Sequence, residues 1–280
     1  MSHDFEQYIP VMKEAGVNTF MPEHKAEIRR VFGSGAVSFT IDPAKRKSSE
    51  LYLRSALRLR TNQLIGSFVW YMAGAGIASK ILEGMVEKID PPVKGFYILR
   101  VGFTKDGMVG ERKIRTLIDK ADKKDNGPFK GSSYSNSHYI DDKMINHWLT
   151  RFVRKVGADE MTQFPLIRDG LMSTVGPRGY TENEQRDLDI MTEAVESHKL
   201  ENSHEVKWIV KNHKGIVQKR ENRPGILNPR AALRASSHIS RMALDIWYFT
   251  NANPGLDWKI ALSAITNRER TALFNGADGK

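Results

Sequence analysis

Apolar residues recur at intervals of three, four and seven along much of the chain. This spacing is typical of helices that bury one face and expose the other. Three such series are present, and together they predict a mostly α fold. Their apolar positions are Leu53, Leu57, Leu64, Phe68, Met144, Trp148, Phe152, Val156, Leu188, Met191 and Val195.

Residues with helix-end chemistry lie next to these series. Ser48 and Ser49 precede the first series and are predicted to cap its helix. Gly157 follows the second and is expected to end it. Thr181 and Glu184 have the spacing of a capping box, which predicts that a helix begins just after Thr181.

Two Asn-Pro pairs predict the last helices of the chain. An asparagine can cap a helix while the following proline occupies its first turn. Asn228-Pro229 predicts a helix that continues to about Phe249, and Asn253-Pro254 predicts a final helix.

One segment has the character of strands instead. Residues 96–103 are rich in β-branched and aromatic side chains, and Asp106-Gly107 is a typical two-residue turn before Met108-Val109. One small β-hairpin is therefore expected. The fold class predicted is a mostly α helical core domain with this hairpin and with extended amino- and carboxy-terminal arms.

The clearest boundary in the sequence is Asp90-Pro91-Pro92, because consecutive prolines stop a helix. We expect residues 1–92 to form an amino-terminal arm with a helical extension, residues 93–252 the helical core, and residues 253–280 a carboxy-terminal helix and arm. The apolar stretch 64–79 is shorter than the roughly 20 residues that cross a bilayer, so membrane insertion is not expected.

The net charge of the chain limits the kinds of partner that it is expected to bind. The chain has 43 Lys and Arg against 33 Asp and Glu, a formal net charge of +10, and this balance favours phosphate-rich partners. No cysteine is present, which excludes disulfides, thiolate metal sites and thiol catalysis. The amino terminus shows no secretory signal pattern, so cytosolic synthesis is expected.

The positive charge is concentrated between Lys207 and Arg241, where Glu221 is the only acidic residue. On the helix expected after Pro229, basic side chains and Asp245 share one sector. Such a face can follow a sugar-phosphate backbone, with Trp247 and Tyr248 stacking on bases. The alternative is a solvated face on which Arg241 and Asp245 form an ordinary pair four residues apart. The sector comprises Arg230, Arg234, His238, Arg241 and Asp245.

Familiar catalytic motifs are missing from the sequence. Gly74-Ala75-Gly76 lacks the strand and the third glycine of a dinucleotide-binding loop. No HExxH pair, GxSxG elbow or phosphate-binding P-loop occurs. The sequence therefore predicts no catalysis, no metal, no cofactor and no small-molecule substrate.

Several short motifs occur in the order found in one viral family. The chain from about Gly95 onward resembles the coat protein core of potyviruses and related flexible filamentous plant viruses. The motifs are Ser135-Asn136-Ser137, Asn146 to Leu149, Phe152-Val153, Arg168 to Met172, Asn228-Pro229-Arg230, Leu233-Arg234, Ser240 to Asp245, Trp247 to Phe249 and Leu273 to Gly279.

The resemblance implies a coat protein that self-associates into a flexible helical filament and encapsidates the viral genome, a single-stranded RNA, in a basic groove. The expected localisation is the virion and the host cytoplasm. A nucleoprotein of a negative-strand RNA virus and a membrane-surface protein are the alternatives. The RNA-binding residues expected from the basic sector and the resemblance are Ser173, Lys207, Arg230, Arg234, Arg241 and Asp245.

Overall fold

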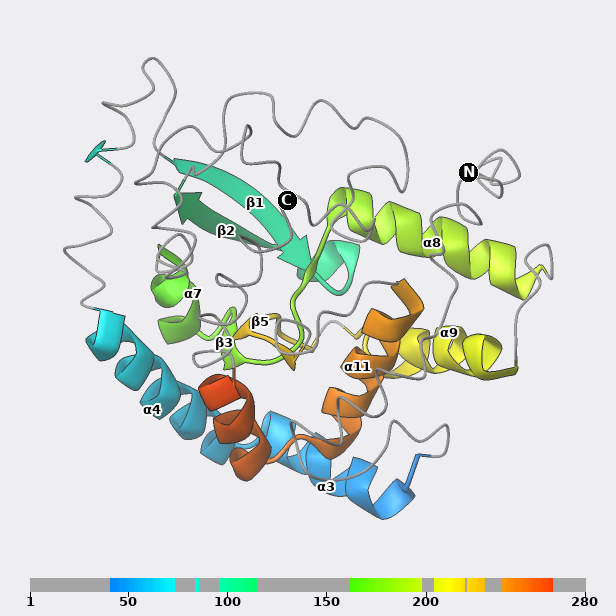
Figure 1. Ribbon diagram of the computed structural model, residues 1–280, viewed down its shortest axis with the longest axis horizontal. Coiled ribbons are helices and arrows are strands. Elements are labelled where there is room, and N and C mark those ends of the chain that lie inside the picture. Colours follow the sequence, from blue (N-terminus) through cyan, green and yellow to red (C-terminus); the bar gives the residue numbers. More distant parts are fainter. Residues whose placement is uncertain are drawn as a thin grey trace, which may run out of the picture.

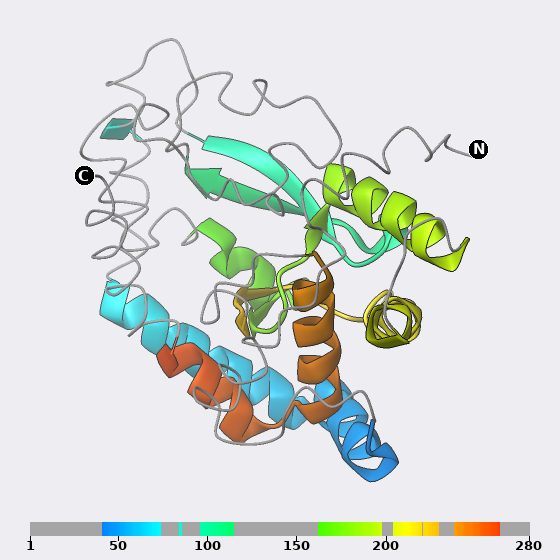
Figure 2. The ribbon, with the colours of Figure 1, turned by 45° about the vertical axis from the view of Figure 1, so that its right-hand side comes forward.

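In the computed structural model, helices pack around a small two-stranded sheet, and a three-stranded sheet lies at one side of them (Figures 1 and 2). The structure describes residues 41–73, 84–85, 96–114, 162–197, 204–219, 221–229 and 238–263.

The first described helices, α3 (Pro43–Arg54) and α4 (Ala56–Ala73), follow one another with Ser55 in an extended conformation between them. Asp42 caps α3 by accepting from the amides of Ala44 and Lys45. The prediction of a cap at Ser48 or Ser49 is therefore wrong, because the helix begins earlier. Ser49 instead links α3 to the end of α11 (His238–Asn251): its hydroxyl donates to the carbonyl of Phe249 at 2.9 Å and accepts from the amide of Ala252 at 2.9 Å.

The hairpin is confirmed: β1 (Phe96–Gly102) pairs antiparallel with β2 (Val109–Ile114). Its turn differs from the prediction. A short 3₁₀ helix, η2 (Lys105–Gly107), connects the strands, and the Thr104 side chain accepts from the amide of Gly107. A third strand, β4 (Tyr180–Thr181), pairs antiparallel with the end of β1.

A second sheet, which the sequence pattern did not reveal, joins β3 (Ser173–Val175) to β5 (Gly225–Leu227) in parallel. The short helix α7 (Phe164–Arg168) precedes β3. The two backbones meet closely at Gly225, where an added Cβ would lie 2.3 Å from the backbone nitrogen of Gly176. A side chain at position 225 would therefore force the strands apart.

Three longer helices form most of the remaining core: α8 (Glu182–Glu196), α9 (His204–Ile216) and α11 (His238–Asn251). The capping box of Thr181 and Glu184 at the start of α8 is confirmed. Helix α11 packs against both α3 and α9 (Figures 1 and 2), so residues about 200 positions apart in sequence share one core.

Helical residues 254–263 follow α11, and the Asn253 side chain accepts from the amide of Leu256, as predicted for this cap. The predicted series 144–156 and the residues just after Pro229 lie outside the described residues, so those predictions stand untested. The division at residue 92 and the mostly α class of the whole chain also remain predictions. Among the described residues, no helix is long and apolar enough to cross a membrane.

Candidate functional site

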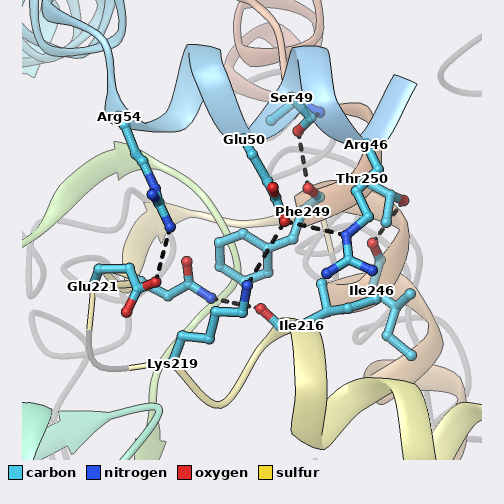
Figure 3. Close-up of polar contacts among 12 residues, drawn as sticks. Arg46, Ser49, Glu50, Arg54, Ile216, Lys219, Glu221, Ile246, Phe249 and Thr250 are labelled. Atoms are coloured by element: carbon cyan, nitrogen blue, oxygen red, sulfur yellow. Dashed lines mark hydrogen bonds and ion pairs between the residues drawn. The ribbon is translucent and has the colours of Figure 1, made fainter. Parts of the chain in front are cut away.

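A pocket opens between α3 and the segment that follows α9, with α11 forming its inner wall (Figure 3). Its enclosed space is small, about 30 Å³, which is room for one or two water molecules, so a larger ligand fits only if the wall moves. Both charged and apolar side chains form its wall. We call this cavity the α3–α9 pocket. It is lined by Glu50, Leu53, Arg54, Arg58, Ile216, Lys219, Glu221, Asn222 and Phe249.

Two ion pairs link the two sides of this pocket (Figure 3). Arg54 Nη2 lies 3.2 Å from Glu221 Oε1. Lys219 Nζ lies 3.7 Å from Glu50 Oε1, which also accepts from Arg46 Nε at 3.1 Å. Partial burial alone would raise the pKa of Glu50, but the Arg46 hydrogen bond and the nearby positive charges outweigh it and lower the pKa. Glu50 is therefore ionised at neutral pH.

Arg58 is the buried cation of the pocket wall. Its side chain is 7% exposed, and Nη1 contacts the carbonyl of Leu53 at 3.4 Å. Its Nε and Nη2 atoms are shielded from solvent and have no hydrogen-bond partner in the structure. Buried guanidinium groups are normally paired, so these two donors have capacity for an anion. Two adjacent N–H groups of an arginine match the geometry of a phosphate.

Behind Arg58 lies a buried carboxylate shared by two tyrosines. Asp257 accepts from the hydroxyl of Tyr52 at 2.6 Å and from that of Tyr248 at 2.9 Å, and its own exposure is zero. Burial raises the pKa of Asp257 to about 6, although the tyrosine hydrogen bonds and the charge of Arg58 act in the opposite direction. The cluster joins α3, α11 and the final helical residues.

The raised pKa of Asp257 predicts a pH-dependent stability. The unfolded chain ionises this group near 3.8 and the folded chain near 6. Because the folded chain holds this proton more tightly, the unfolding free energy falls by about 3 kcal/mol as pH rises from about 4 to 6. The two tyrosine hydrogen bonds to the carboxylate remain above that pH.

Chemical denaturation of the wild type and of Asp257→Asn between pH 4 and 7.5 measures this change. The difference in unfolding free energy between the two proteins should move in favour of the variant as pH rises. A constant difference across that range would contradict the assignment.

A second buried polar cluster involves Asp245. Its carboxylate accepts from the hydroxyl of Tyr180, which also lies 2.9 Å from Nε2 of His213. Asp245 Oδ2 lies 3.6 Å from the same nitrogen, and Asp245 and His213 have no exposed surface. The cluster joins β4, α9 and α11 inside the core.

The described members of the predicted RNA-binding set do not share one exposed surface. Ser173 is buried in β3, Arg241 and Asp245 are buried in α11, and Lys207 is exposed on α9. Arg230 and Arg234 lie outside the described residues. Among the described members, no continuous surface track forms.

The predicted stacking residues are also in the core. Trp247 is 6% exposed and Tyr248 is not exposed. Their aromatic faces pack inside the protein, so neither is available to stack on bases.

The comparison with protein families indicates an enzyme rather than an RNA-binding protein. A family model described as bacterial sugar transferase matches residues 81–269, about two thirds of the chain. The chain therefore belongs to the bacterial sugar transferase family. The search of individual curated proteins gave no match.

This membership corrects the interpretation made from the motifs. The coat protein resemblance is wrong, and so are the predictions of a non-enzyme, a single-stranded RNA partner, a filament and a virion or host-cytoplasm localisation. The prediction that no small molecule is bound is also wrong for a sugar transferase. The nucleoprotein and membrane-surface alternatives receive no support. The short motifs misled because each is common alone, and their order was the only specific signal.

The α3–α9 pocket was missed because its residues are dispersed along the chain. Arg54 and Arg58 were visible as a basic pair four residues apart, and Glu221 as the only acid of a basic segment. Nothing in the local pattern shows that these segments meet. Among the described residues, no group of three His, Asp or Glu is placed to hold a metal ion.

Proposed function

We propose that this chain transfers a sugar from a phosphate-activated donor to an acceptor, and that the α3–α9 pocket binds the phosphate of the donor. The observation that carries the proposal is Arg58, a buried arginine in the pocket wall with two unpaired N–H donors. Membership of the bacterial sugar transferase family supports sugar transfer, although the matched residues 81–269 include the Lys219 and Glu221 side of the pocket and not Arg58. A nucleotide-sugar is the donor class that combines an activated sugar with phosphate groups.

The charges around the pocket favour a phosphate over a neutral ligand. Arg54, Arg58 and Lys219 contribute three positive charges to the lining, against two negative charges from Glu50 and Glu221. Arg58 is the least hydrated of the three cations, so an anion that reaches it gains more than at an exposed residue.

In the transfer, an acceptor oxygen forms a bond to the transferred group as the bond to the departing phosphate breaks. The phosphate leaves with the electron pair, and the acceptor oxygen loses its proton to solvent or to a carboxylate. Negative charge therefore accumulates on the phosphate oxygens in the transition state. Fixed donors such as those of Arg58 stabilise charge that develops at such a position.

Equilibrium binding of nucleotide-sugars to the full chain tests the proposal. UDP-glucose, UDP-N-acetylglucosamine and GDP-mannose can be compared by calorimetry, with inorganic pyrophosphate as competitor. We expect at least one of them to bind and pyrophosphate to displace it. Binding that pyrophosphate does not affect, or no binding of any of the three, would contradict a phosphate site in this pocket.

A further inference from the structure

The other two cations of the pocket, the exposed Arg54 and the partly buried Lys219, are already engaged by carboxylates of the protein. Glu221 lies against Arg54, and Glu50 lies against Lys219 (Figure 3). Each carboxylate occupies the position that a phosphate oxygen would take beside the same cation. In the unliganded pocket, the carboxylates of Glu50 and Glu221 therefore stand where the negative charges of a ligand would be.

The two pairs also connect opposite sides of the pocket. Glu50 and Arg54 belong to α3, whereas Lys219 and Glu221 belong to the segment after α9. The contacts thus hold these two segments together while the pocket is empty. Arg58 lies in the same wall, and its free nitrogens are shielded from solvent. A phosphate reaches those nitrogens only if the wall rearranges.

We propose that Glu50 and Glu221 form an acidic latch, which closes the pocket when it is empty and which the donor phosphate displaces on binding. This inference rests on the proposed function, because it assigns a role to residues of the same pocket. On binding, Arg54 and Lys219 exchange a carboxylate partner for a phosphate, and the wall around Arg58 opens. The latch makes the pocket selective for ligands with enough negative charge to compete with both carboxylates.

The latch is weak enough to be displaced. The side chains of Arg54 and Glu221 are 67% and 52% exposed, and those of Lys219 and Glu50 are 29% and 39% exposed. Exposed ion pairs contribute little because water and salt screen them. A diphosphate that contacts Arg54, Lys219 and Arg58 together replaces two weak pairs with several charge-assisted hydrogen bonds.

Calorimetric titration with inorganic pyrophosphate tests the latch. Glu50→Gln and Glu221→Gln should each bind pyrophosphate about two- to five-fold more tightly than the wild type, since each removes one carboxylate that competes for a cation of the pocket. The double variant should exceed either single variant. Glu182→Gln is the matched control, because Glu182 forms a comparable exposed ion pair with Arg100 at 2.7 Å outside the pocket. It should bind as the wild type does.

A charge-preserving variant separates displacement of the latch from a simple loss of negative charge. Glu221→Asp keeps the carboxylate but shortens the side chain, so the pair with Arg54 is broken or lengthened. The latch predicts tighter pyrophosphate binding for this variant as well. If Glu221→Asp binds pyrophosphate as the wild type does while Glu221→Gln binds it more tightly, the latch is wrong. The gain in affinity would then come only from the lost negative charge.

The remaining outcomes also distinguish the two proposals. If pyrophosphate binds the wild type and Arg58→Gln abolishes that binding, but the glutamine variants at 50 and 221 bind no more tightly, the latch is wrong and the phosphate site stands. If the wild type does not bind but the double variant does, the latch is supported as a closed state. If no variant binds, both proposals fail.

Discussion

Replacing Arg58 with glutamine is expected to lower kcat/KM for the nucleotide-sugar by about 10- to 100-fold. The substitution keeps a polar side chain but shortens it, and it removes both the charge and the paired Nε and Nη2 donors. A charge-assisted hydrogen bond in a buried site contributes about 1.5–3 kcal/mol, which corresponds to that range of rate. Steady-state kinetics on the full chain measures the effect, and thermal unfolding confirms that the variant is folded.

Two further variants make the result for Arg58 specific. Arg58→Lys retains the positive charge without the planar pair of donors, so an intermediate loss is expected. Arg100→Gln removes an exposed arginine that pairs with Glu182 outside the pocket, and it should leave kcat/KM unchanged. A folded Arg58→Gln protein with wild-type kcat/KM would show that the pocket does not bind the donor phosphate.

Replacing Asp257 with alanine is expected to lower the free energy of unfolding at pH 7 by about 2–5 kcal/mol, since two buried donors are left unpaired. The substitution leaves the buried hydroxyls of Tyr52 and Tyr248 without their shared acceptor and removes the negative charge near Arg58. It also creates a small cavity where three segments meet. Urea denaturation, with the slope compared to that of the wild type, measures the loss.

Asp257→Asn is the matched comparison, because an amide preserves the volume and can still accept a hydrogen bond. We expect this variant to lose much less stability than Asp257→Ala. Asp106→Ala, at an exposed position in the hairpin turn, should change stability by less than about 0.5 kcal/mol. Equal effects of the alanine substitutions at 257 and 106 would contradict a stabilising role for the tyrosine–aspartate cluster.

Local patterns predicted some elements of the fold well. The capping box of Thr181 and Glu184 and the cap at Asn253 act over a few residues, so their chemistry is visible in the sequence. The hairpin was recognised from its β-branched and aromatic residues, but its turn was not, because Thr104 stabilises a 3₁₀ conformation instead. The short parallel pair of β3 and β5 gave no signal, since each strand has only three residues.

The candidate site depends on contacts that no local pattern contains. Arg54 and Glu221 are 167 positions apart, and Tyr52 and Asp257 are 205 apart. For Asp245 the sequence pattern predicted too much exposure. Its position beside basic residues indicated a surface groove, whereas its contacts with Tyr180 and His213 lie in the core. Periodicity identifies which helix face is apolar, but not which charged residues of that helix are buried with partners from elsewhere.

A structure of the full chain in complex with a nucleotide-sugar, or with its unreactive analogue, tests the central claim most directly. We expect phosphate oxygens within hydrogen-bond distance, about 3 Å, of Arg58 Nε or Nη2. Arg54 and Lys219 should then contact the ligand and no longer contact Glu221 and Glu50. A diphosphate bound elsewhere on the chain, with the α3–α9 pocket empty and both ion pairs intact, would contradict the assignment of this pocket as the donor site.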